Sequence, residues 1–296
     1  MRRIGIDLGG TKTELILTEE NPLEVVAKTR VPTGQENGYN FIVGQIAGLV
    51  KEFLKQCPSP PSIGIGIPGT LNHKTGLVRN ANTQCLIGKP FGKDLEAAIG
   101  LPVMVENDAN CFALSEALFG AGQGYGRVMG IIMGTGLGGG LVENGRLWTG
   151  SMGIAGEFGH STINYNGPAC WCGNKGCLEV YISGTAAETF YRNLTGTHRK
   201  LAEIYEDYLA RRSEPAQKTI EDLLFHFGLG MANLITCYDP DLLVIGGGVS
   251  KLPVLYDLGV KAVQSHIFND ELTTPIVQNR LGDSSGVYGA ALLGGT

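Results

Sequence analysis

The sequence lacks the features that mark several large classes of protein. Only 17% of its 296 residues are charged, and the formal net charge of −5 provides no basic surface for nucleic acid or anionic lipid. No apolar run approaches the ~20 residues of a membrane span, and the N-terminus has no long apolar segment typical of a signal peptide. We therefore expect a soluble, cytoplasmic protein that binds neither nucleic acid nor membrane.

The sequence also lacks the regular cysteine pattern of a disulfide-stapled protein. Its cysteines number seven, which is odd; three of them crowd into residues 170–177 and four are scattered. This uneven distribution indicates a reducing compartment and a local metal site.

Apolar residues and glycines are plentiful instead. Hydrophobic residues make up 43% of the chain, enough for real cores, and its length allows one large or two modest domains. The 45 glycines are about twice the usual share of roughly 7%, and they gather in short motifs. Glycine-rich motifs of this kind suit turns through which the backbone approaches a ligand.

The chain reads as two halves that open alike, each with a strand, a Gly/Thr hairpin and a returning strand. Strands alternate with helices, which predicts an α/β fold. The strands are expected at residues 4–7, 13–17, 25–30, 63–67, 102–105, 128–133, 141–143 and 242–245, and the helices include 37–56, 109–119 and 285–293.

Two glycine hairpins and a later glycine triplet are candidate phosphate-binding elements. The first hairpin is Asp7-Leu-Gly-Gly-Thr-Lys12, the second is a turn over residues 134–140, and the triplet is Gly246-Gly-Gly248. Backbone N–H groups in such turns can approach an anion, and Asp7 can hold Mg²⁺. Neither hairpin is a P-loop, and neither is a Rossmann fingerprint because each leads into a strand. Taken singly, each could be an ordinary structural hairpin.

A candidate zinc site is the sharpest local signal. His160, Cys170, Cys172 and Cys177 have the spacing His-x9-Cys-x-Cys-x4-Cys. Four soft or borderline ligands in one loop suit tetrahedral Zn²⁺, and four protein ligands predict a closed, structural site. The alternative is a histidine beside reduced thiols.

Asp108 is a candidate site residue. It follows Asn107 at the point where a strand ends and a helix begins. A carboxylate at the C-terminal end of such a strand faces the region where α/β sheets bind ligands. The alternative is that Asp108 caps the helix, and the two roles are compatible.

These motifs together resemble the ROK family of bacterial sugar kinases, within the actin–hexokinase–Hsp70 superfamily. They follow the family's order along nearly the whole chain. The motifs are Asp7-Leu-Gly-Gly-Thr-Lys, Gly66-Ile-Pro-Gly69, Glu106-Asn-Asp-Ala-Asn110, Gly134-Thr-Gly-Leu-Gly-Gly-Gly140, Gly156-Glu-Phe-Gly-His160, Cys170-Trp-Cys-Gly-Asn-Lys-Gly-Cys177-Leu-Glu179, and Asp239-Pro through Gly248.

The resemblance implies two ribonuclease-H-like α/β domains with ATP in an interdomain cleft. A small domain would comprise residues 1–119 and a C-terminal helix at about 283–296. A large domain would comprise residues 120–282, with the zinc loop and helical insertions. The family also suggests a homodimer.

The resemblance further implies ATP-dependent, Mg²⁺-dependent phosphorylation of a hexose at its 6-hydroxyl. Asp108 would be the base. The residues expected to bind sugar are Gly69, Asn82, Asn107, Asp108, Glu157, His160 and Glu179. The residues expected to bind ATP are Asp7, Gly9, Gly10, Thr11, Lys12, Gly134, Thr135, Gly136, Gly246, Gly247 and Gly248.

The sugar itself stays open at this point. Residues 80–91 look most like fructokinase or mannokinase members, so fructose or mannose is the first expectation, with N-acetylglucosamine kinase or glucokinase as alternatives. A different class, the ROK sugar-sensing repressors, carries a helix-turn-helix domain ahead of this body, and the first predicted strand at about residue 3 leaves no room for one.

Overall fold

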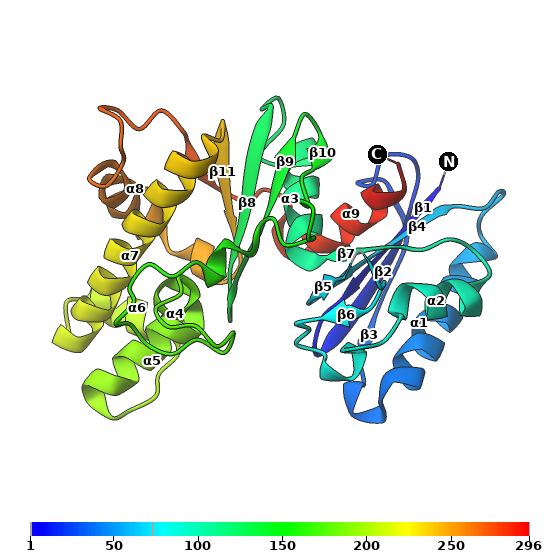
Figure 1. Ribbon diagram of the computed structural model, residues 1–296, viewed down its shortest axis with the longest axis horizontal. Helices are drawn as coiled ribbons and strands as arrows, with labels where there is room; N and C mark the ends of the chain where they lie inside the picture. Colours follow the sequence, from blue (N-terminus) through cyan, green and yellow to red (C-terminus); the bar gives the residue numbers. More distant parts are fainter. Residues whose placement is uncertain (1, 73, 296) are drawn as a thin grey trace. The chain divides into compact units, whose positions relative to one another are not determined.

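The computed structural model describes residues 2–72 and 74–295 (Figure 1). The chain forms two compact units. The first comprises Met1–Gly124, Gly140–Ala155 and Leu281–Thr296, and the second comprises Tyr125–Gly139 and Gly156–Arg280. The sequence placed residues 140–155 in the second domain; they group with the first unit because Gly140 and Gly145 lie against Asn110 and Leu118, which belong to the helix at Asp108–Phe119.

The first unit is built on a five-stranded mixed sheet of order β3-β2-β1-β4-β7. Its strands are β1 (Arg3–Leu8), β2 (Lys12–Thr18), β3 (Val25–Pro32), β4 (Ser62–Ile67) and β7 (Met104–Asn107). The first three form an antiparallel meander, while β4 pairs parallel to β1 and to β7. Its helices are α1 (Tyr39–Leu54), α2 (Phe91–Ile99), α3 (Asp108–Phe119) and α9 (Ser285–Leu292), and a small hairpin joins β5 (Thr70–Leu71) to β6 (Val78–Arg79).

Alternation along β1 and β4 sorts large and small side chains onto opposite faces of this sheet. Ile4, Ile6 and Leu8 point to one face and pack with α1 and α2 in the main apolar core. Gly5 and Gly64 lie on the other face, where α9 covers the sheet (Figure 1). A Cβ atom at Gly5 would lie 2.3 Å from the Val287 carbonyl oxygen, so only glycine lets α9 come this close.

A buried carboxylate fastens α9 to α3. Glu116 is fully buried, and its Oε1 accepts hydrogen bonds from the Leu281 amide (2.9 Å) and the Ser285 hydroxyl (2.8 Å). Its Oε2 accepts one from the Ala121 amide (3.0 Å). The Glu116 side chain therefore holds two parts of the first unit together. One is Ala121, just before the chain passes into the second unit, and the other is the segment from Leu281, where the chain returns.

The second sheet has the order β10-β9-β8-β11-β12. Its strands are β8 (Arg127–Met133), β9 (Leu137–Glu143), β10 (Arg146–Leu147), β11 (Leu242–Gly246) and β12 (Ile276–Gln278), with β11 parallel to both β8 and β12. Asn144 and Gly145 form the hairpin turn between β9 and β10, both with positive φ. The helices of the second unit are α4 (Glu179–Ile182), α5 (Gly184–Thr195), α6 (Leu201–Leu209), α7 (Glu214–Tyr238) and α8 (Leu258–Gln264).

Several predicted boundaries differ from the structure. The turn predicted over residues 134–140 is shorter, because β9 already begins at Leu137. The strand predicted at 102–105 runs from Met104 to Asn107, since Pro102 has no N–H to give to a parallel ladder.

The first helix also differs from its prediction. The sequence predicted it over residues 37–56, but Gly38 occupies the N-cap position and α1 begins at Tyr39. Phe41 is 42% exposed, because the buried stripe of α1 runs through Ile42, Ile46 and Val50. Among the described residues, no helix is both long and apolar enough to cross a membrane.

Candidate functional site

The first glycine hairpin joins β1 to β2 and is fastened from β3. Within it, the Gly9 amide donates to the Lys12 carbonyl (2.9 Å). The fully buried Thr33, just after β3, donates from its hydroxyl to the Gly9 carbonyl (2.7 Å), and its amide donates to the Thr11 carbonyl (3.0 Å). Sequence analysis missed Thr33, because only strand pairing brings it to the hairpin.

Asp7 ends β1 at the base of this hairpin. Burial raises its pKa to about 6, and the charge of Glu14 adds to the effect, while that of Arg30 opposes it. The start of α9 lies close by, because a Cβ atom at Gly286 would be 3.4 Å from Asp7 Oδ2. Burial disfavours the ionised form of this carboxylate, and a cation bound beside the glycine turn would offset that cost, so Asp7 is suited to be a cation ligand.

Asn107, not Asp108, caps α3. The Asn107 Oδ1 accepts from the amides of Ala109 (2.9 Å) and Asn110 (3.3 Å), and its Nδ2 donates to the Gly69 carbonyl (3.0 Å). The Asn82 amide donates to the Pro68 carbonyl (2.9 Å). The structure therefore brings Gly69, Asn82 and Asn107 together, with Asp108 as the first residue of the helix.

Glu106 supports this turn from the strand side and was not assigned a role from the sequence. Its Oε1 accepts from the Asn107 amide (2.7 Å) and from Asn110 Nδ2 (3.0 Å). The buried Asn110 Oδ1 has no hydrogen-bond partner among the residues that the structure describes. The side chains of Asn107, Asn110 and Glu106 thus fix the backbone on either side of Asp108.

The second glycine turn and the glycine triplet lie against each other in the second unit. The Gly134 amide donates to the Gly136 carbonyl (3.0 Å), which closes the turn. Gly247 lies against this turn, since a Cβ atom on it would be 2.5 Å from the Met133 carbonyl oxygen. The Gly184 amide, at the start of α5, donates to the Gly134 carbonyl (2.7 Å). Exposed Thr135 occupies the tip of the turn.

Glu179 joins this glycine turn to the cysteine loop. Its Oε2 accepts from the Leu137 amide (3.0 Å) and lies where a Cβ atom on Gly136 would meet it at 2.7 Å. Its Oε1 accepts from the indole Nε1 of Trp171 (2.8 Å). The carboxylate assigned to sugar from the sequence is therefore also in contact with a turn assigned to ATP.

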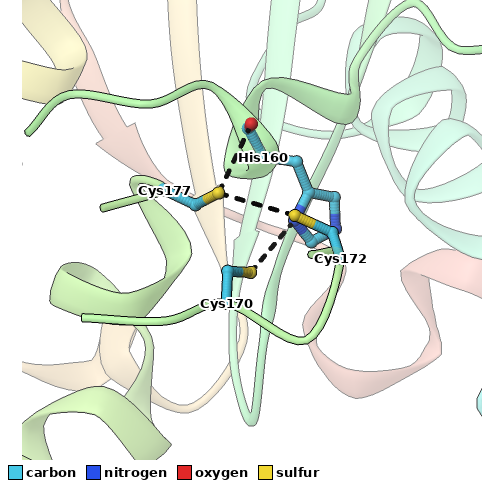
Figure 2. A group of neighbouring side chains, drawn as sticks. All are labelled: His160, Cys170, Cys172 and Cys177. Carbon is cyan, nitrogen blue, oxygen red and sulfur yellow. Dashed lines mark hydrogen bonds between the residues drawn. The ribbon is translucent and has the colours of Figure 1, made fainter. Parts of the chain in front are cut away.

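The four predicted zinc ligands converge, and Figure 2 shows their side chains pointing toward one another. Their ligand atoms all lie within 4.8 Å of one another. Cys170 Sγ is 3.6 Å from His160 Nδ1, and Cys172 Sγ is 3.6 Å from Cys177 Sγ.

These separations fit a tetrahedral zinc ion. Bonds of ~2.3 Å to sulfur and ~2.0 Å to nitrogen put neighbouring ligand atoms about 3.5–3.8 Å apart. The two measured separations of 3.6 Å lie inside this interval, and a separation of 3.6 Å is too long for a disulfide.

Glu157 and His160 occupy the two ends of one short 3-10 turn. Burial raises the pKa of Glu157; the charge of His160 opposes the rise and that of Glu179 adds to it. The sequence-predicted residues thus form two groups, one in each unit. Gly69, Asn82, Asn107, Asp108 and the first hairpin lie in the first, and Glu157, His160, Glu179, the cysteines and the other glycine elements lie in the second.

Solved structures with this arrangement define the class of the fold. The ROK hexokinase of Thermus thermophilus matches with a TM-score of 0.90 and 32% identity, over 99% of this chain and 98% of that chain. A ROK family glucokinase from Streptomyces griseus, solved with glucose and AMPPNP, matches with a TM-score of 0.81 and 30% identity, over 99% of both chains. The fold is therefore the ribonuclease-H-like α/β fold of the actin–hexokinase–Hsp70 superfamily, which confirms the predicted fold class.

The family follows from the sequence comparison. The profile of the ROK family matches residues 3–295, so the chain belongs to the ROK family, as the resemblance predicted. The N-acetyl-D-glucosamine kinase of Haemophilus influenzae (strain 86-028NP) is 39% identical over 300 residues, which are 98% of each chain. The predicted preference for fructose or mannose finds no support among such relatives, which favour the alternative instead.

Proposed function

We propose that the protein transfers the γ-phosphoryl group of ATP to the 6-hydroxyl of N-acetylglucosamine. Full-length similarity to kinases named for this sugar supports the choice of acceptor over fructose or mannose. Similarity to a glucokinase solved with glucose and AMPPNP supports a hexose and an adenine nucleotide as the two substrates.

The observation that carries the proposal is the position of Glu179. Phosphoryl transfer requires the acceptor hydroxyl and the polyphosphate to lie within a few ångströms of each other. Glu179 touches the glycine turn through the Leu137 amide and the cysteine loop through Trp171. A carboxylate that accepts from a sugar hydroxyl here would hold the acceptor directly beside a phosphate-binding turn.

Asp108 is the base in this proposal. Its carboxylate takes the proton of the 6-hydroxyl while the sugar oxygen forms a bond to the γ-phosphorus. The bond from that phosphorus to the oxygen bridging to the β-phosphate breaks, and ADP leaves with that oxygen. Asn107 and Glu106 fix the backbone around Asp108, so the base keeps one position as the proton moves.

The remaining assignments concern phosphate and cations. The two glycine hairpins and the triplet offer N–H groups to the phosphates, and Asp7 is the side chain we assign to Mg²⁺. Mg²⁺ would spread the charge that develops on the phosphoryl oxygens. Zn²⁺ would be held by His160, Cys170, Cys172 and Cys177, with no open position for substrate. Three reduced thiolates and the use of ATP agree with a cytoplasmic location.

The test is a panel of sugars in an assay that couples ADP release to a signal. We expect kcat/KM for N-acetylglucosamine to exceed that for fructose, mannose and glucose by at least ~10-fold, within the range that one substituent contributes in a pocket. A higher kcat/KM for fructose or mannose would restore the first expectation.

A sugar-sensing regulator is the alternative from another class. Calorimetric titration of the same sugars separates it from a kinase. Sugar binding with no ADP release above the Asp108→Asn background would favour the regulator, whereas turnover excludes it. A homodimer stays a prediction.

A further inference from the structure

Trp171 is an exposed tryptophan placed between two candidate zinc ligands. It lies between Cys170 and Cys172, and 64% of its surface is exposed. The sequence contains only two tryptophans, of which the other is Trp148. Because its ring buries little area, Trp171 contributes little to the apolar core, and specific contacts must explain its orientation.

Two contacts fix the indole. Its Nε1 donates to Glu179 Oε1 (2.8 Å). Its ring meets the His160 imidazole edge to face, with the centroids 4.9 Å apart and an interplanar angle of 89°. Trp171 thus touches a predicted zinc ligand on one side and a predicted sugar ligand on the other.

Glu179 is oriented from both ends as a result. Oε2 accepts from the Leu137 amide (3.0 Å) and Oε1 from the indole. The Cys170 Sγ atom also lies 3.9 Å from Oε1. An ionised carboxylate offers about four lone-pair sites, so these three contacts still leave about one for a sugar hydroxyl donor. The indole directs the carboxylate without using up its capacity to accept.

We propose that Trp171 is a positioning residue for the sugar, which holds Glu179 in its binding orientation and links that orientation to the zinc loop. This inference rests on the proposed function, because it takes Glu179 to bind sugar. A glutamate left free to rotate would lose side-chain entropy when the sugar binds, and that loss lowers affinity. The metal then affects sugar binding indirectly: it fixes Cys170 and Cys172, these fix the indole between them, and the indole orients Glu179.

The decisive variant is Trp171→Phe, which keeps an aromatic ring for His160 and removes the N–H donor. We expect KM for the sugar to rise about 2- to 10-fold, the range for one released side chain. We expect kcat to stay within about twofold, because Glu179 would contact substrate and transition state equally. Zinc should stay at one per chain. Trp148→Phe, which changes the other tryptophan, is the matched control and should leave the sugar KM unaltered.

A second readout does not need turnover. In the Trp148→Phe background, Trp171 is the only tryptophan, and its fluorescence should shift when sugar binds and again when a chelator removes zinc. Glu179→Gln should produce a shift in the sugar-free protein, because it alters the acceptor of the indole N–H.

Each outcome has one meaning. An unaltered sugar KM in Trp171→Phe, or a loss of zinc from that variant, would overturn the positioning role. If the wild type neither binds nor phosphorylates any hexose, the proposed function fails. Even then, the fluorescence responses to zinc removal and to Glu179→Gln report whether the indole couples the two loops.

Discussion

Carboxylates of the same chemistry behave differently in this protein according to what surrounds them. Glu14 is buried, which by itself raises its pKa, but hydrogen bonds from Lys28 and Arg30 outweigh burial and lower it. Among the described residues no cation donates a hydrogen bond to Asp7; the more distant charge of Arg30 does not offset burial, and the pKa of Asp7 rises to about 6. The charge on Asp7 therefore costs folding free energy that a bound cation would recover.

Asp7→Asn should stabilise the ligand-free protein at neutral pH. Because the folded-state pKa of Asp7 is raised from 3.8 to about 6, the folded state binds an extra proton between these values, and stability falls as pH rises through that window. The full shift corresponds to about 3 kcal/mol, which partial solvent contact reduces to roughly 1–2 kcal/mol. Urea unfolding without Mg²⁺ or ATP should show this gain at pH 7.5 and little gain near pH 4. An equal difference at both pH values would contradict the assignment.

Asp108→Asn should remove turnover and spare the fold. The cap of α3 belongs to Asn107, so the substitution leaves the helix end intact. We expect kcat to fall by at least ~10²-fold, the lower end of general-base contributions, with sugar and ATP affinities within a few fold. Single-turnover kinetics measures the first and calorimetry the second. Near-normal turnover in a folded variant would exclude Asp108 as the base.

At the scale of elements, the sequence predicted those parts that local chemistry decides. The strand–hairpin–strand openings and the zinc loop were predictable because their residues are close in sequence. The cap of α3 was not, because Asn107 and Asp108 are both good caps and only the backbone path selects between them. The links from Thr33 to the first hairpin and from Trp171 to Glu179 were also missed, since they exist only after packing.

Substitutions in the second glycine turn test whether Glu179 couples that turn to sugar binding. Gly136→Ala would place a Cβ atom 2.7 Å from Glu179 Oε2, so the carboxylate must move. We expect KM to rise at least ~10-fold for ATP and also for the sugar. At Gly134, a Cβ atom would meet no atom of the described residues within 4 Å, so Gly134→Ala should leave the sugar KM within about twofold. Equal sugar KM values in the two variants would show that Glu179 does not couple the turn to the sugar.

At the scale of the whole molecule, zinc should stabilise the second unit and support both substrates. Cys172→Ser removes one of the four ligands, and we expect the variant to lose zinc and about 5 °C or more in Tm. Because Glu179 connects the metal loop to the glycine turn, affinity should fall for sugar and, to a smaller extent, for ATP.

Elemental analysis and calorimetry check this prediction. Cys237→Ser, which changes an exposed cysteine in α7 outside the cluster, is the control and should retain zinc. A metal-free wild type with full activity would refute the zinc site.

The packing of α9 has a consequence for how the protein is made. The sheet that begins at residue 3 is completed by a helix at residues 285–292, whose backbone fills the space above Gly5 and Gly64. The Glu116 carboxylate likewise accepts hydrogen bonds from Leu281 and Ser285 only after those residues have been synthesised. At ~5–20 residues per second, the roughly 160 residues that separate Gly124 from α9 take about 8–32 s to synthesise. During this time α3 covers this face of the nascent sheet beside Gly66, but the surface above Gly5 and Gly64 stays exposed on the ribosome, so the unit that is translated first is the last to be finished.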